Sequence, residues 1–164
     1  MKLGMFAAVA AAAALLGGQA LAQEAVVGVA NPEALFTSKD PVLNKNKQAA
    51  YHIVKDLLEA GQWEQADKYL TPAYHQHNPL AASGRDGVVY FFTQVLKVKP
   101  SPVPEKMKTA IVAVLAQGDL VTVVYPKVMK DPKDPSKTYT TTWFDMWRFV
   151  DGKADEHWDP AVKN

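Results

Sequence analysis

Residues 138–160 read Thr-Tyr-Thr-Thr-Thr-Trp-Phe-Asp-Met-Trp-Arg-Phe-Val-Asp-Gly-Lys-Ala-Asp-Glu-His-Trp-Asp-Pro, and the rest of the sequence can be interpreted from this segment. Its first half is dense in β-branched and aromatic residues, which favour strands. Asp151-Gly152, in its middle, is a strong signal for a two-residue hairpin turn. The stretch therefore predicts two antiparallel strands, at about residues 140–150 and 153–159.

Side chains alternate between the two faces of a strand, so the hairpin can be divided by face. One face of the first strand carries Trp143, Asp145, Trp147 and Phe149, and the other carries Phe144, Met146 and Arg148. On the returning strand, His157 and Asp159 share one face, and Glu156 and Trp158 share the other. Carboxylates in an apolar cleft are costly unless paired, and they suit proton transfer. The hairpin therefore indicates more than a structural role.

The N-terminal segment has the features of a secretory signal peptide. A lysine at position 2 precedes an apolar run from Met5 to Leu16, and Ala20-Leu21-Ala22 is a small-x-small cleavage site. The run is too short to span a bilayer comfortably, although a retained anchor helix is the alternative. We expect residues 1–22 to be removed, giving a secreted or periplasmic protein that has no membrane contact after cleavage.

Composition limits the partners and the compartment. Without residues 1–22 the chain keeps 17 basic and 17 acidic residues, because Lys2 is the one charge removed. This balance, with no basic run, argues against nucleic acid as a partner. The sequence has no cysteine, so an exported protein must be stabilised by burial rather than by disulfides. The length suits one domain.

The first part of the chain predicts helices. Residues 23–43 contain two prolines and little periodicity, which predicts a flexible or loosely docked lead-in before a domain over 44–164. An apolar stripe from Asn44 to Gly61 predicts the first helix, and a second runs from Trp63 to Leu70. A short extended segment over 74–79 precedes a third helix at about 85–97.

The second part predicts strands. Ile111 to Ala116 and Leu120 to Tyr125 are nearly continuous apolar runs, which indicates that both sheet faces are covered. Pro126 implies a sheet edge or a bulge near that point. Helices first and strands later predict an α+β domain, with three helices packed on a strongly curved antiparallel sheet. Such a sheet leaves a cone-shaped pocket, and its other face meets a cavity, a second sheet region or another subunit.

Two motifs together resemble the SnoaL-like polyketide cyclases of the nuclear transport factor 2-like superfamily. They are Tyr74…Gln76-His77-Asn78-Pro79 and Asp145…Arg148-Phe149…Asp151-Gly152-Lys153…Glu156-His157-Trp158-Asp159. The resemblance covers about residues 45–160. It implies an α+β cone that admits small molecules, often in a dimer packed through the sheet. His75, Ala154 and Pro160 depart from the family pattern.

The resemblance also implies roles for individual residues. Asp159 matches the family's general acid/base, which moves a proton beside a carbonyl during aldol closure. Asp145 and His77 would hold or polarise the substrate. Gln76, Asn78 and His157 would contact it, while Trp143, Trp147 and Tyr125 would shape the pocket. Each role has a structural alternative: Asp159 could bond backbone before Pro160, and His77 could be a buried histidine bonded to backbone.

Some of the same residues could also form a metal site. His75 and His77 lie two apart, and His157 with Asp159 could complete a mixed set of nitrogen and oxygen ligands. The family that the chain resembles is metal-free, and no thiolate is present. We therefore expect no metal and no cofactor. Ser-His-Asp spacing, a phosphate-binding loop and a nucleotide fingerprint are also absent from the sequence.

Two functions remain open at this point. The first is a cofactor-independent enzyme that acts by acid/base chemistry on a small, largely apolar carbonyl compound, as an aldol-type cyclase or isomerase. The second is a binding or dimeric interaction module with the same pocket and no catalysis. The apolar strands fit a homodimer through the sheet in either case.

Overall fold

A computed structural model describes residues 23–163 of the chain. The expected signal peptide, residues 1–22, lies outside the described residues, which begin at Gln23. The helices found within residues 23–163 are all too short or too polar to cross a membrane.

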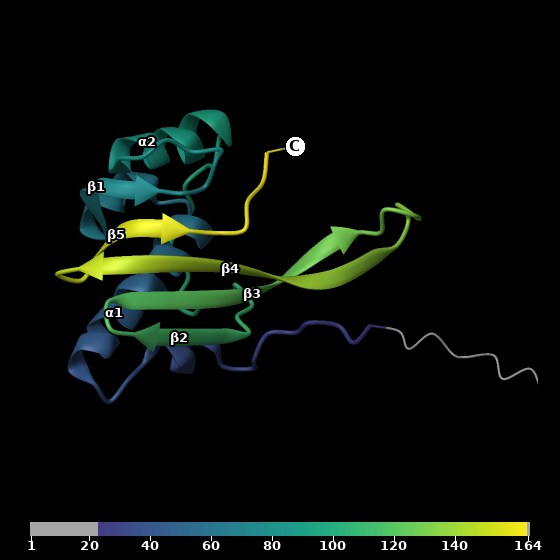
Figure 1. The fold of residues 1–164 in the computed structure, drawn as a ribbon, viewed down its shortest axis with the longest axis horizontal. Coiled ribbons are helices and arrows are strands. Elements are labelled where there is room, and N and C mark those ends of the chain that lie inside the picture. The colour runs from purple at the N-terminus through teal and green to yellow at the C-terminus, as the bar shows by residue number, and fades with distance from the viewer. Residues whose placement is uncertain (1–22, 164) are drawn as a thin grey trace, which may run out of the picture.

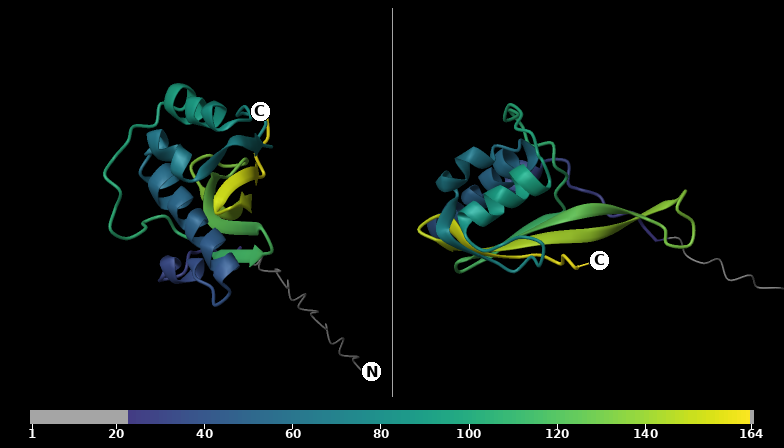
Figure 2. Two further views of the ribbon diagram at one scale, coloured as in Figure 1. Left: turned by 90° about the vertical axis from the view of Figure 1, so that its left-hand side faces the viewer. Right: turned by 90° about the horizontal axis from the view of Figure 1, so that it is seen from above.

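Five strands form one sheet in the order β1-β5-β4-β3-β2. They are β1 (Leu70–Gln76), β2 (Ala113–Gln117), β3 (Leu120–Lys130), β4 (Thr138–Val150) and β5 (Lys153–Trp158). The helices lie on one side of this curved sheet, as the right-hand view of Figure 2 shows, so the α+β architecture is confirmed. One pairing differs from the expected antiparallel sheet, because β1 runs parallel to β5.

The β4–β5 hairpin forms as the sequence predicts. Asp151 and Gly152 have φ values of 52° and 84°, the positive angles that a tight hairpin turn requires. The ladder contains one bulge, since Arg148 pairs with Glu156 while Phe149 pairs with Ala154. Asp155 is the extra residue, which allows Ala154 and His157 to face the core although they lie three positions apart.

The helical layer begins earlier than expected. Helix α1 (Pro41–His52) starts at a proline, and Asp40 caps it by accepting hydrogen bonds from the Val42 and Leu43 amides. It continues as a π-helical segment, η2 (Ile53–Glu59). The second helix is the 3₁₀ segment η3 (Trp63–Lys68), which ends just before β1. The third combines α2 (Arg85–Tyr90) with η4 (Phe91–Val95), which confirms the three predicted helices.

The expectation of a flexible lead-in is wrong for residues 32–43. Residues Pro32–Phe36 form a 3₁₀ helix, η1, and the Phe36 side chain is 0% exposed in the core. The Gln48 amide donates to the Phe36 carbonyl at 3.0 Å, and Lys47 donates to that of Leu35 at 2.8 Å. Periodicity missed this segment because a single turn with one deeply buried aromatic residue has no repeat to detect.

The core lies between the helices and the inner face of the sheet. Its fully buried side chains include Phe36, Val54, Leu57, Leu70, Ile111, Val121 and Val123. Strands β3 and β4 continue past the ends of their neighbours as a two-stranded arm (Figure 1). Pro126 lies in this arm and pairs only with Thr142, since β2 reaches no further than Val124. The edge position expected for Pro126 is therefore confirmed.

Candidate functional site

A cavity of about 230 Å³ lies between the helical layer and the inner face of the sheet at β1, β4 and β5. Its lining has a polar end and an apolar end. The polar end consists of Gln76, Asn78, Asp145, His157 and Asp159. The remainder is apolar or aromatic: Ile53, Leu58, Trp63, Leu70, Tyr74, Ala81, Val88, Phe91, Phe92, Leu96, Trp143 and Trp147.

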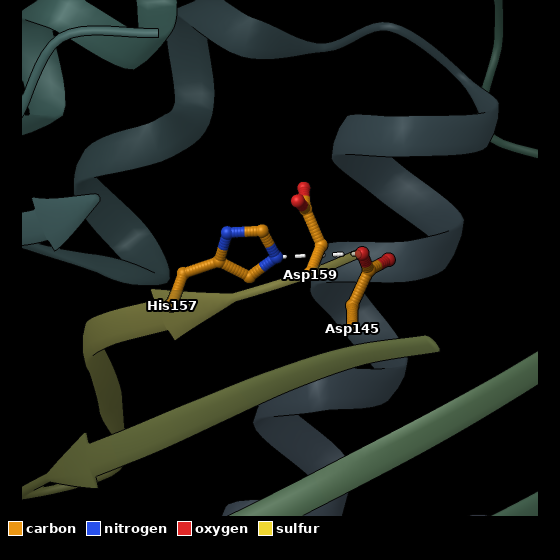
Figure 3. A group of neighbouring side chains, drawn as sticks. All are labelled: Asp145, His157 and Asp159. Atoms are coloured by element: carbon orange, nitrogen blue, oxygen red, sulfur yellow. Dashed lines mark hydrogen bonds and ion pairs between the residues drawn. The ribbon is translucent and has the colours of Figure 1, made fainter. Parts of the chain in front are cut away.

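Asp145, His157 and Asp159 form the centre of the polar end (Figure 3). Asp145 and His157 are both buried, and Nε2 of His157 lies 3.4 Å from Oδ1 of Asp145. The same carboxylate oxygen accepts a hydrogen bond from Nε1 of Trp143 at 3.1 Å. Alternation along β4 and β5 brings these side chains to one face, as the hairpin pattern predicted.

Gln76 sets the tautomer of His157. The Asn78 amide N–H donates to Oε1 of Gln76 at 2.9 Å, so that oxygen acts as an acceptor. The same Oε1 lies 2.8 Å from Nδ1 of His157, which must therefore carry a proton. As a result, Nε2 is the nitrogen that faces Asp145.

This arrangement requires one additional proton between Asp145 and His157. If His157 were neutral, its Nε2 lone pair would face an ionised carboxylate, which is repulsive. A favourable contact needs a proton on either Nε2 or the carboxylate. The pair therefore holds a proton that it can donate to a ligand oxygen.

Asp159 is arranged in the opposite way, as an acceptor. Its Oδ2 accepts from Nδ2 of Asn78 at 2.7 Å, and its Oδ1 accepts from the Ala161 amide at 2.9 Å. The Asn78 amide orientation is fixed because its Oδ1 accepts from the Leu80 N–H. Both oxygens of Asp159 therefore act as acceptors, beside a pair that carries a proton.

Tyr74 supports the same wall from β1 and was not among the predicted site residues. Its hydroxyl accepts a hydrogen bond from Nε1 of Trp147 at 3.1 Å in the interior. Burial raises the pKa of Tyr74 far above the usual tyrosine value, and the negative charges of Asp145 and Asp159 act in the same direction. Tyr74 therefore stays neutral and orients the Trp147 ring, which lies 5.4 Å from that of His157.

His77 does not lie in the cavity, contrary to the expected catalytic role. Its Nε2 contacts Oε1 of Glu156 at 2.8 Å, and its ring stacks on Trp158 at 5.2 Å, on the outer face of the sheet. Strand alternation explains the difference: Gln76 and Asn78 point inward, so His77 between them points outward. His77 therefore cannot hold or polarise a substrate in the cavity that Asp159 lines.

Tyr125 lies next to the site rather than in the cavity wall. Its hydroxyl is buried without a hydrogen-bond partner among the described residues. Burial and the charge of Asp145 raise the pKa of Tyr125 well above its ordinary value. Trp143 and Trp147 do line the cavity, as expected.

Sequence reasoning missed most of the apolar end. Trp63 and Phe92 line it, with their rings stacked at 3.8 Å, and Phe91 meets Phe92 edge-on. Both phenylalanines lie in the predicted third helix at about 85–97. The helical stripes show only that these side chains face inward, and do not separate a cavity wall from a filled core.

The metal set considered from the sequence is not brought together, because His75 is exposed and His77 lies on the outer face. Within residues 23–163, Asp145, His157 and Asp159 form the one group that could hold an ion, with a ligand atom from each lying within 4.8 Å of the others. The hydrogen bonds of these three residues are equally consistent with a role in proton transfer.

The fold and the cavity define a cone-shaped α+β domain of the nuclear transport factor 2-like class. The model of the SnoaL-like domain family matches residues 52–157, so the chain belongs to that family, as the two motifs indicated. No curated protein matches the chain.

Several solved structures have the same fold. A candidate SnoaL-like polyketide cyclase from Jannaschia sp. CCS1 is 15% identical, covers 76% of this chain and 91% of its own, and has a TM-score of 0.52. A candidate polyketide cyclase from Bacillus cereus is 20% identical, covers 83% of this chain and 90% of its own, and has a TM-score of 0.50. A third candidate polyketide cyclase, from Acidithiobacillus ferrooxidans, is 18% identical and covers 70% of this chain and 86% of its own. Its TM-score is also 0.50.

Proposed function

We propose that the cavity binds a small, largely apolar carbonyl compound and catalyses an aldol-type cyclisation or an isomerisation without a cofactor. The observation that carries this proposal is the meeting of an acceptor carboxylate, Asp159, with a proton-bearing Asp145–His157 pair at one end of an apolar cavity. Proton abstraction beside a carbonyl needs both a base and a donor to the developing oxyanion.

The proposed reaction divides the work between these groups. Asp159 removes a proton from the carbon next to the carbonyl, and the electron pair of the C–H bond moves toward the carbonyl oxygen. The Asp145–His157 pair gives that oxygen a hydrogen bond or its proton. The enolate carbon then attacks a second carbonyl of the same molecule, whose π electrons move to its oxygen, and that oxygen takes the proton from Asp159. In an isomerisation, the proton on Asp159 returns at another carbon instead. Trp143 and Trp147 hold the apolar body of the substrate.

Turnover of a panel of β-keto and cyclic enone compounds tests this proposal. We expect Asp159→Asn to lower the rate by about 100-fold or more, which is the usual contribution of a general base. Asp145→Asn should lower it as well. Glu156→Gln is the matched control, since it removes a carboxylate from the outer face of the same strand. An unchanged rate in Asp159→Asn removes the aspartate from the mechanism.

A binding protein without catalysis is the second candidate, and the predominantly apolar lining of the cavity favours it. Native mass spectrometry of protein purified from its own host would then reveal a small molecule that is carried and never transformed. In that case Asp159→Asn changes affinity or stability, with no rate to lose.

We also propose export and self-association. The charged start, apolar run and Ala20-Leu21-Ala22 site support cleavage after Ala22. N-terminal sequencing of secreted or periplasmic protein should then begin at Gln23. A homodimer would cover the outer face of the sheet, where Leu115 is 63% and Phe144 41% exposed. Light scattering should give twice the monomer mass, and Phe144→Glu should reduce it to the monomer.

A further inference from the structure

The charges that line the cavity are all at its polar end. Two carboxylates and one histidine lie there, and no lysine or arginine is among the described residues that line the cavity. With one proton held between Asp145 and His157, the polar end still carries a net charge of about −1 through Asp159. An anionic ligand would have to enter this field without a partner of opposite charge, and its desolvation would be uncompensated.

Aromatic rings surround the same acidic end. Trp143 donates its indole N–H to Asp145, Trp147 lies 5.4 Å from the His157 ring, and Tyr74 lies 6.3 Å from it. Ring faces attract cations, and indole does so most strongly. Carboxylates inside a wall of such rings are a suitable environment for a protonated nitrogen attached to an apolar body.

Trp143 already binds a cation from the protein itself. The ammonium group of Lys127 lies 3.5 Å from the centre of the Trp143 ring. Lys127 follows Tyr125 on the same side of β3, in the β3–β4 arm, and does not line the cavity. The positive charge of Lys127 reduces the negative potential near Trp143. Lys127 therefore weakens the preference of the cavity for cations.

We infer that the ligand of this cavity is a small apolar or aromatic molecule that carries a protonated nitrogen, and that the cavity excludes carboxylates and phosphates. The inference builds on the pocket of the proposed function and specifies its substrate class as an amine-bearing carbonyl compound. The ammonium group would lie against Asp159, which carries the net charge of the polar end, and the surrounding rings. The apolar body would extend toward Trp63 and Phe92.

Three probes of the same shape and different charge test the inference on the full chain. They are 1-naphthylmethylammonium, the neutral 1-naphthylmethanol and the anionic 1-naphthoate, compared by isothermal titration calorimetry at pH 7. We expect the ammonium to bind about tenfold or more tighter than the alcohol, and the anion to show no binding. Equal or tighter binding of the alcohol or the naphthoate overturns the inference, and so does the absence of binding by all three.

Charge variants locate the effect. Asp159→Asn removes the net negative charge of the polar end and should reduce the preference for the ammonium over the alcohol at least about threefold. Glu156→Gln removes the same charge from the outer face and should leave the preference unchanged. Lys127→Met should increase it. If Glu156→Gln and Asp159→Asn act alike, the preference is a general surface effect and the inference is wrong. If either variant unfolds, Lys127→Met decides the question, because an unchanged or lower preference overturns the inference.

These measurements need no turnover, so they separate the inference from the catalytic proposal. Loss of the charge preference in a protein that still converts a neutral carbonyl compound overturns the inference alone. A strong preference for the ammonium in a protein without turnover overturns catalysis alone.

Discussion

Oε1 of Gln76 on β1 lies 2.8 Å from Nδ1 of His157 on β5, so one strand decides which nitrogen of a histidine on the next strand carries the proton. The two residues are neighbours in the parallel ladder. The other nitrogen, Nε2, faces Oδ1 of Asp145 at 3.4 Å at the polar end of the cavity.

Replacing Gln76 should release this tautomer. In the wild type at pH 7, nitrogen NMR should show a protonated Nδ1 on His157. In Gln76→Leu the proton should no longer be confined to Nδ1, and stability should fall by about 1–3 kcal/mol because a buried donor loses its partner. Gln94→Leu, at an exposed helical position, is the control. An unchanged His157 spectrum in Gln76→Leu would show that Gln76 does not set the tautomer.

Tyr74→Phe should destabilise the protein without enlarging a cavity. The substitution removes the only hydrogen-bond partner that the described residues give to Nε1 of Trp147. We expect a loss of about 1–3 kcal/mol in chemical denaturation, the cost of an unsatisfied buried donor. Tyr90→Phe removes a hydroxyl from an exposed side chain and should change the free energy of unfolding by less than about 0.5 kcal/mol. Equal effects of the two variants would contradict this role of Tyr74.

Phe36→Ala should show that residues 32–43 belong to the packed domain. Phe36 is fully buried, and truncating such an aromatic side chain to alanine lowers the free energy of unfolding by about 3–5 kcal/mol. Val27→Ala, which lies in the lead-in before this segment and is 71% exposed, should have little effect on thermal or chemical unfolding. If both variants are as stable as the wild type, the lead-in does not contribute to the core.

The outer face should contribute to stability in a pH-dependent way. Hydrogen bonds from His77 and then Arg148 hold the pKa of Glu156 below its ordinary value. A lowered pKa in the folded state means that this stabilisation is present above the unfolded pKa and is lost as the pH falls through the folded one. The contribution should be below about 1 kcal/mol because the pair is partly exposed.

Urea unfolding of the wild type and Glu156→Gln, measured from pH 7 down to pH 3, checks this sign. The difference between the two proteins should be largest near pH 7 and should shrink as the solution becomes more acidic. Asp67→Asn, on an exposed part of η3, is the control. A difference that grows toward low pH would contradict the assigned direction.

The sequence predicted the hairpin and its two faces because alternation and the Asp151-Gly152 turn are local signals. Asp145, His157 and Asp159 meet as that pattern implies, and Asp145 does not pair with Arg148, whose partners are Glu156 and Asp119. His77 was placed wrongly for a reason that was visible in advance. Gln76, His77 and Asn78 are consecutive, and an extended segment cannot direct all three to one side.

Other features had no local signal. The parallel pairing of β1 with β5 joins Gln76 to His157 across 81 positions, and nothing near either residue specifies a partner so distant. The bulge at Asp155 depends on that neighbouring strand as well as on the turn. Phe36 reaches the core from a single helical turn, so only the assembled domain shows its burial.

The long-range β1–β5 pairing also has a kinetic consequence. Contacts between segments far apart in sequence form late in folding, because closing a long loop must precede any gain from them. The donor and acceptor groups of the cavity therefore come together only after most of the sheet exists. A ligand that bridges both strands should slow unfolding and leave the folding rate almost unchanged.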